Sequence, residues 1–216
     1  MPPHQLPLFP LQVVLFPGAM IPLYIFEPRY RQLLADVSAG DRRFGILPPG
    51  VDGGLPDPGA VGCSAMLRGV QALPDGCANI VVSGEERFRF LGAVASDSPY
   101  HRGLVEPFGD EVEVQVPSEA ELRRLRALAE RYAAALESRN DQFLELQFSL
   151  VPGTLTFQAA ALLEWSFEDR QRVLESRSLR ERVTLLLHAL PALVQTAEQR
   201  ARIHGQSKQN GHGALR

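Results

Sequence analysis

Lysine is almost absent from this chain of 216 residues, because all but one of its 22 basic residues are arginine. The single lysine, Lys208, lies in a stretch rich in glycine and polar residues. A phosphate-binding P-loop needs G-x-x-x-x-G-K-[ST], and a Ser-Lys peptidase needs a desolvated lysine as its base. Neither site can be built here, and G-x-S-x-G, H-E-x-x-H and a strand-linked G-x-G-x-x-G are missing too. We therefore expect a protein that is not an enzyme.

Cysteine and histidine are also too scarce and too scattered for a metal site. The two cysteines, Cys63 and Cys77, lie fourteen positions apart without C-x-x-C spacing, so zinc lacks ligands and a disulfide is not expected in a reducing compartment. The five histidines show no ligand spacing: His4, His101, His188, His204 and His212. We expect no metal and no cofactor.

Long hydrophobic runs are missing, since no window approaches the 18 or so apolar residues of a membrane span. The N-terminus has no basic region, and Pro10 and Pro17 interrupt its apolar residues, which makes it a poor secretory signal. The sequence predicts a soluble protein of the cytoplasm, with no membrane partner.

Charge differs between the two halves of the chain. Residues 1–116 carry 8 arginines against 13 carboxylates, a net charge of −5, whereas residues 117–216 have a net charge of +2. The pair Arg87 and Arg89 flanks an aromatic residue in a way that is typical of nucleic-acid contacts. The negative charge of that half argues against such a partner, because phosphate binding depends on neutralising cations.

The first half is predicted to be rich in β-structure, with one helix. Short apolar or alternating runs bounded by proline and glycine indicate a strand and a turn over 6–18, and strands over 21–26, 44–47, 61–70, 78–83, 86–91 and 111–116. Apolar residues at helical spacing after Pro28 predict a helix that ends near Gly40. Closely spaced short strands favour a closed or partly closed barrel.

The second half changes to helical periodicity. Three capping boxes mark helix starts: Ser118 with Glu121, Ser166 with Asp169, and Ser178 with Glu181. An apolar stripe through Leu125 follows the first box, and another through Leu186 follows the third. Pro191 is expected to kink or divide the last helix. The predicted organisation is a β-rich lobe over 1–116, a helical lobe over 117–204 and a disordered tail over 205–216.

Four short segments are informative when they are read together: Leu6-Pro7-Leu8-Phe9-Pro10-Leu11, Val14-Leu15-Phe16-Pro17-Gly18, Ile25-Phe26-Glu27-Pro28-Arg29-Tyr30-Arg31 and Gly40-Asp41-Arg42-Arg43-Phe44-Gly45. They resemble the Lon substrate-binding domain family, which is the N-terminal domain of the ATP-dependent protease Lon and also occurs as stand-alone bacterial proteins. Support continues at Arg170-Gln171 and Leu174-Glu175, and the resemblance covers about residues 6 to 195.

The resemblance implies an α+β fold, with a PUA-like β-barrel lobe followed by a helical bundle. It also implies a non-catalytic module that binds unfolded or extended polypeptide, with a Lon-type protease as a further partner. Two alternatives stay open. One is RNA binding by analogy with other PUA-like folds, and the other is an unrecognised small-molecule enzyme.

Two groups of residues are candidates for the site. Phe9, Phe16 and Phe44 would contact a bound peptide if they are exposed, although alternating aromatic residues in strands usually belong to the core. The element Glu27-Pro28-Arg29-Tyr30 could face a ligand, but its residues suit a corner between a strand and a helix, and we favour this structural role.

Overall fold

The computed structural model describes residues 2–112, 114–140 and 147–211, and it divides the chain into two compact units. The first unit comprises Met1–Glu111 and Trp165–Arg177, and the second comprises Val112–Glu164 and Ser178–Arg216. The predicted mixture of α and β structure is confirmed. The predicted division at Pro117 is not followed, because residues 165–177 return to the first unit.

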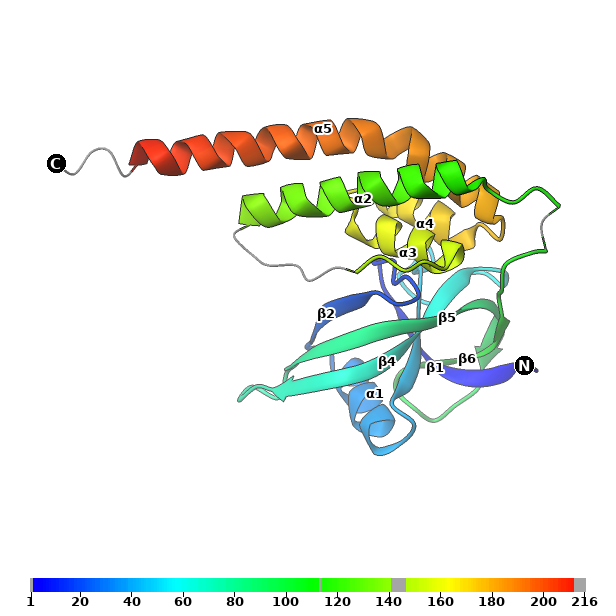
Figure 1. The fold of residues 1–216 in the computed structure, drawn as a ribbon. Coiled ribbons are helices and arrows are strands. Elements are labelled where there is room, and N and C mark those ends of the chain that lie inside the picture. Colours follow the sequence, from blue (N-terminus) through cyan, green and yellow to red (C-terminus); the bar gives the residue numbers. More distant parts are fainter. Residues whose placement is uncertain (1, 113, 141–146, 212–216) are drawn as a thin grey trace. The chain divides into compact units, whose positions relative to one another are not determined.

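A six-stranded sheet forms the first unit (Figure 1). Its strands are β1 (His4–Pro10), β2 (Met20–Ile25), β3 (Arg43–Leu47), β4 (Val61–Ala72), β5 (Ala78–Val94) and β6 (His101–Pro107). The strand order is β2-β5-β4-β3-β1-β6, and β6 also pairs with β5. The pairings of β5, β4, β3, β1 and β6 therefore close into a ring, and β2 extends the sheet beyond β5.

Two apolar clusters fill the first unit. The larger one packs helix α1 (Pro28–Ala39) against the sheet through the buried residues Tyr30, Leu33, Leu34 and Val37. The smaller one gathers Leu6, Leu8, Leu47, Phe88, Phe90 and Val105. Burial of such side chains is the main favourable term in folding, so these clusters hold the strands in register.

Helix α4 (Phe167–Glu175) is attached to the β-structure by side chains that reach backbone carbonyls. Gln171 Nε2 donates to the Val61 carbonyl at 2.9 Å, and Arg170 Nη2 donates to the Val14 carbonyl at 3.3 Å. Such bonds satisfy buried polar groups that would otherwise be costly. They explain why this helix belongs to the first unit although it follows the helical half of the sequence.

The second unit contains α2 (Glu119–Asn140), α3 (Pro152–Leu162) and α5 (Leu179–Gly211). Helices α2 and α5 run side by side in the same direction (Figure 1), and Arg131 of α2 pairs with Glu198 of α5 at 2.9 Å. The predicted apolar stripes face this core, since Leu125, Leu128, Leu186 and Leu190 are buried.

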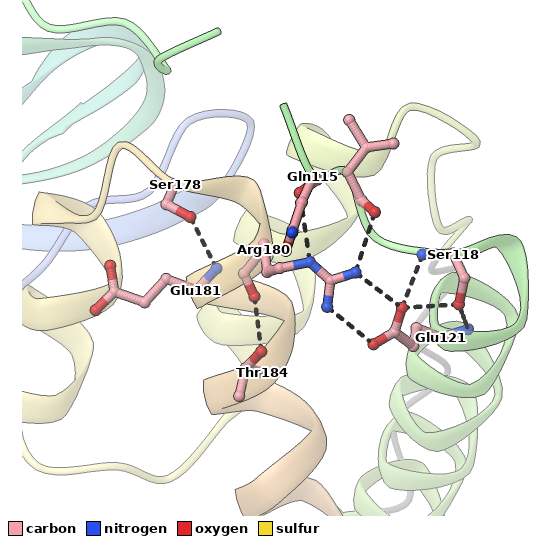
Figure 2. A network of polar contacts seen from close by, with 8 residues as sticks. Gln115, Ser118, Glu121, Ser178, Arg180, Glu181 and Thr184 are labelled. Carbon is pink, nitrogen blue, oxygen red and sulfur yellow. Dashed lines mark hydrogen bonds and ion pairs between the residues drawn. The ribbon is translucent and has the colours of Figure 1, made fainter. Parts of the chain in front are cut away.

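A polar network joins the starts of α2 and α5 (Figure 2). Glu121 accepts from the Ser118 backbone N–H at 2.7 Å, which completes the predicted capping box. Arg180 donates to the Val116 carbonyl at 3.1 Å and pairs with Glu121 at 3.3 Å. These contacts cap the start of α2 and connect it to the start of α5, so we assign a structural role to the network.

Two expectations about elements are wrong, and a third is narrowed. The stretch 111–116 is not a strand in its described residues, because Val112 and Val114 are fully exposed and find no partner strand; Glu113 lies outside the described residues. Of the two outcomes expected at Pro191, division of the helix does not occur, because α5 is continuous through this residue. It also continues to Gly211, so residues 205–211 are helical rather than disordered, while 212–216 lie outside the described residues.

Candidate functional site

The three aromatic residues predicted to contact peptide all belong to the core. Phe16 and Phe44 have no exposed surface and Phe9 retains only 6%. The ring of Phe9 lies 4.0 Å from that of Tyr30, centroid to centroid, and 6.4 Å from that of Phe44. Aromatic residues in strands bury large apolar areas, and for this reason they usually belong to the core. The structure therefore leaves these three side chains almost no exposed surface for contact with a peptide.

The element Glu27-Pro28-Arg29-Tyr30 forms the corner between β2 and α1. Pro28 occupies the first helical turn, where its missing N–H has no partner to lose. The Arg29 guanidinium pairs with Glu27 at 2.9 Å and stacks on the Tyr30 ring at 4.6 Å. Tyr30 itself is buried. The side chains thus bind one another, and the contacts support the structural role.

Arg87 and Arg89, which flank Phe88 in the sequence, are engaged within the first unit. Arg87 is buried and donates to the carbonyls of Leu174 and Ser176, both at 2.7 Å. Arg89 pairs with Glu106 at 3.3 Å. Both guanidinium groups also lie over the Phe108 ring. The two guanidinium groups are therefore already engaged by protein groups, whereas binding to RNA would require their positive charges to contact phosphates.

Strand β2 carries the candidate site that the sequence did not reveal. Its even-numbered side chains share one exposed face, which continues into Phe26 just after the strand. On this face Met20, Tyr24 and Phe26 are 64%, 51% and 57% exposed, and Pro22 is also exposed. The Tyr24 and Phe26 rings stack with their centroids 5.8 Å apart. Large apolar side chains gathered on a surface indicate a binding region.

Strand β2 also lies at one edge of the sheet. Strand β2 stands at the end of the strand order, with β5 as its one partner in the described sheet. Pro22 lies opposite Val81 and brings no N–H to the ladder, which only an edge strand tolerates well. A proline also weakens edge-to-edge pairing with another strand. The geometry therefore favours contact through side chains over addition of a complete new strand.

A shallow groove of about 530 Å³ lies beside this face, between β2, β4 and β5. Pro22, Tyr24, Val70, Gln71, Asn79 and Val81 contribute to its lining. All of its lining residues are uncharged. Its amide side chains can bond to a peptide backbone while the apolar ones contact side chains, which suits an extended polypeptide.

Tyr24 also has a polar neighbour at the end of the β4–β5 hairpin. A hydrogen bond with the Cys77 side chain raises the pKa of the Tyr24 hydroxyl, and burial and the nearby charge of Asp75 act in the same direction. The Tyr24 hydroxyl therefore stays protonated across the neutral range and is available as a donor. Cys77 is half-buried, so its thiol reports directly on this part of the surface.

The sequence signal for this face was weak. Residues 20–26 read Met-Ile-Pro-Leu-Tyr-Ile-Phe, so both faces of the strand are apolar and alternation does not distinguish inside from outside. Ile25 is buried while its neighbours Tyr24 and Phe26 are exposed. The one hint in the sequence was that this run is apolar on both faces, so that one face would be exposed if no second layer covered it.

No helix in the described part of the chain is long and apolar enough to cross a membrane. Within residues 2–112, 114–140 and 147–211, no group of three or more histidine, cysteine or acidic side chains is arranged to hold a metal ion.

Comparison with known proteins identifies the family. The model of the ATP-dependent protease La (LON) substrate-binding domain matches residues 5–191, and the chain therefore belongs to this family. The Lon protease of Xanthomonas oryzae pv. oryzae is 28% identical over 94% of this chain and 25% of its own length. The Lon protease of Solibacter usitatus is 26% identical over 94% of this chain and 26% of its own length. The chain thus spans about a quarter of these curated relatives.

Solved structures show the same fold. The Lon N-terminal domain protein from Xanthomonas campestris superposes with a TM-score of 0.65 at 27% identity, covering 86% of this chain and 98% of that one. The N-terminal domain of Lon protease from the Mycobacterium avium complex gives a TM-score of 0.61 at 16% identity, covering 87% and 98%. At that lower identity the second likeness concerns the fold alone.

Proposed function

We propose that this chain is a non-catalytic module that binds extended, apolar polypeptide on the outer face of β2 and in the adjoining groove. The observation that carries the proposal is the row of exposed apolar side chains at Met20, Pro22, Tyr24 and Phe26. Membership of a substrate-binding domain family supports a polypeptide as the ligand. A Lon-type protease is the partner that the family suggests.

In this proposal the closed ring of strands is a PUA-like barrel and the second unit is a helical bundle. The β5–β6 pairing supports the barrel, and the side-by-side course of α2 and α5 supports the bundle. The almost complete lack of lysine supports a function without ATP hydrolysis or Ser-Lys peptidase chemistry in these 216 residues. A cytoplasmic location remains a prediction from the sequence.

Binding is tested by fluorescence anisotropy with a labelled, unfolded polypeptide, and with its native form as competitor. The unfolded form should bind and the native form should not compete, because only the unfolded form offers contiguous apolar side chains. Replacing Met20 or Phe26 by Gln should weaken binding by about 5- to 30-fold, as expected for an apolar anchor. Val51→Gln, which changes a more exposed apolar residue in a loop, is the control.

A labelled single-stranded RNA distinguishes the alternative function. RNA binding would weaken steeply as salt rises, because it releases counterions, whereas apolar contacts depend little on salt. The proposal is overturned if RNA binds tightly with this salt dependence while unfolded polypeptide does not bind. If the wild-type protein and both Gln variants bind the unfolded polypeptide with equal affinity, the peptide site does not lie on β2.

A further inference from the structure

A second and larger cavity opens at one end of the strand ring. Its volume is about 610 Å³, and it is lined where β1 and β3 begin, where β6 ends, and by the middle of β5. All of its lining residues belong to the first unit. We refer to it as the mouth cavity.

The floor of the mouth cavity is apolar. Leu6, Phe88 and Val105 line it and are buried members of one core cluster. Phe88 fits there because two neighbouring residues lack side chains: a Cβ on Gly45 would lie 2.8 Å from Phe88 Cζ, and a Cβ on Gly62 would lie 2.6 Å from it. Real carbon atoms do not approach so closely, so the glycines make room for the ring.

The rim is acidic. Asp41, Glu85 and Glu86 line it, together with Arg43, whose Nε binds Glu85 at 2.8 Å. Arg87 also lines the cavity, but its guanidinium pairs with Asp110 and donates to carbonyls of the 174–176 segment. The Glu86 carboxylate makes no hydrogen bond or ion pair with the described residues. The charge facing the opening is therefore negative.

A β-bulge accounts for two consecutive glutamates in the same lining. Cys63 pairs with Arg87 and Ala65 pairs with Gly84, so Ser64 alone stands opposite Glu85 and Glu86. The Ser64 hydroxyl fixes this extra residue by accepting from the Glu86 N–H at 3.0 Å and donating to the Glu86 carbonyl at 3.1 Å. In a regular strand consecutive side chains point to opposite faces. The bulge redirects one of them, as bulges near binding sites do.

We propose that the mouth cavity binds a lysine or arginine side chain of the captured polypeptide. Such a side chain has an aliphatic stem, which would pack against Pro107, an exposed apolar residue of the lining, and a cationic head, which would meet Glu86 and Asp41. An acidic side chain or a phosphate would be repelled by the same rim. The inference rests on the proposed function and adds to it a preference for apolar segments that contain a basic residue.

The test uses three labelled peptides that are identical and apolar except for one central lysine, norleucine or glutamate. The lysine peptide should bind the wild-type protein about two- to fivefold more tightly than the norleucine peptide, as one partly exposed ion pair allows, and the glutamate peptide should bind most weakly. The difference should shrink at high salt because the pair is screened. Arginine in the central position should behave as lysine does.

Variants assign this preference to the mouth cavity. The double variant Glu86→Gln with Asp41→Asn should bind lysine and norleucine peptides equally, and Glu86→Lys should reverse the order. Glu130→Gln, an exposed carboxylate on α2, should leave the preference unchanged. Equal affinity of the lysine and norleucine peptides for the wild-type protein, or a preference that survives the double variant, overturns the inference.

The two proposals fail in different ways. If all peptides bind through Met20 and Phe26 but without a preference for lysine, the mouth cavity is not a side-chain site and the β2 surface stands. If the lysine preference depends on Glu86 while the Met20 and Phe26 variants bind normally, the mouth cavity stands and the β2 surface is wrong. If no unfolded peptide binds at all, both are wrong.

Discussion

The guanidinium of Arg87 on β5 donates a 2.7 Å hydrogen bond to the backbone carbonyl of Ser176, 89 positions further along the chain. It also donates to the Leu174 carbonyl and pairs with Asp110. One buried cation therefore joins the end of α4 to the segment that follows β6. Arg177 strengthens the same junction by donating to the Gly109 carbonyl at 2.8 Å.

Replacing Arg87 by Met should lower the free energy of unfolding by about 3–5 kcal/mol, because it leaves two carbonyls and a carboxylate without their buried partner. Urea unfolding measures the loss. Arg123→Met, which removes an exposed pair with Glu119, should change stability by less than about 0.5 kcal/mol. A loss below about 1 kcal/mol for Arg87→Met would mean that the junction depends on other contacts.

Gly84 is a second position where a small change should have a large effect. A Cβ at this residue would lie 2.2 Å from the Phe16 carbonyl oxygen, which is backbone and cannot rotate away. Gly84→Ala should therefore destabilise the protein by about 1–3 kcal/mol or more through overpacking. Gly69→Ala on the adjacent strand is the control, since nothing lies within 4 Å of its added carbon. Thermal unfolding of the two variants should separate them clearly, and similar melting temperatures would contradict the close approach of β5 to residue 16.

Stability should fall in alkaline solution because of Cys63. Burial raises the pKa of this thiol to about 12 from 9.0. Above pH 9 the unfolded chain loses the proton while the folded chain keeps it, so the free energy of unfolding should decrease by up to about 1.4 kcal/mol per pH unit towards pH 12. Cys63→Ala should show a shallower decrease. The decrease in the free energy of unfolding that persists in Cys63→Ala would come from groups such as Tyr30, whose pKa is also raised by burial. Parallel curves for the two proteins between pH 9 and 11 would contradict this account.

The local part of the fold was predictable from the sequence. The three capping boxes form as expected, because a serine and an acidic residue three positions apart need only one turn of chain to meet. Helix α1 starts at Pro28 and ends beside Gly40 for similarly local reasons. The Lon family resemblance was visible in contiguous segments and is confirmed over residues 5–191.

Long-range pairing was not predictable. The runs 78–83 and 86–91 are parts of one strand, β5, and β6 was missed altogether. Helix α4 carries an ordinary capping signal, but the bonds from Arg87 and Gln171 that place it in the first unit span from 87 to 110 positions of sequence. The exposed face of β2 depends on what does not cover it, and hydrophobic alternation carries no information on that point.

Leu186 tests the core of the second unit. Its side chain is fully buried on α5, and Leu186→Ala should cost about 2–5 kcal/mol, the usual effect of removing a buried leucine side chain and leaving a cavity. Urea unfolding again provides the measurement. Because Ala favours helix, a loss near zero would show that α5 contributes its structure through local propensity and not through packing.

Bound polypeptide should protect Cys77 from alkylation. Its side chain lies beside Tyr24 and raises the pKa of that hydroxyl, so a chain that covers the exposed β2 face should hide the thiol. Cys63, the other cysteine, is fully buried with a pKa near 12 and should not react in the folded protein, because the thiolate is the reactive form. Iodoacetamide labelling followed by mass spectrometry measures the rate at Cys77 alone. The rate should fall in proportion to the fraction of protein bound, and Phe26→Gln should require more peptide for the same protection. An unchanged rate at saturating peptide would place the bound chain on another surface.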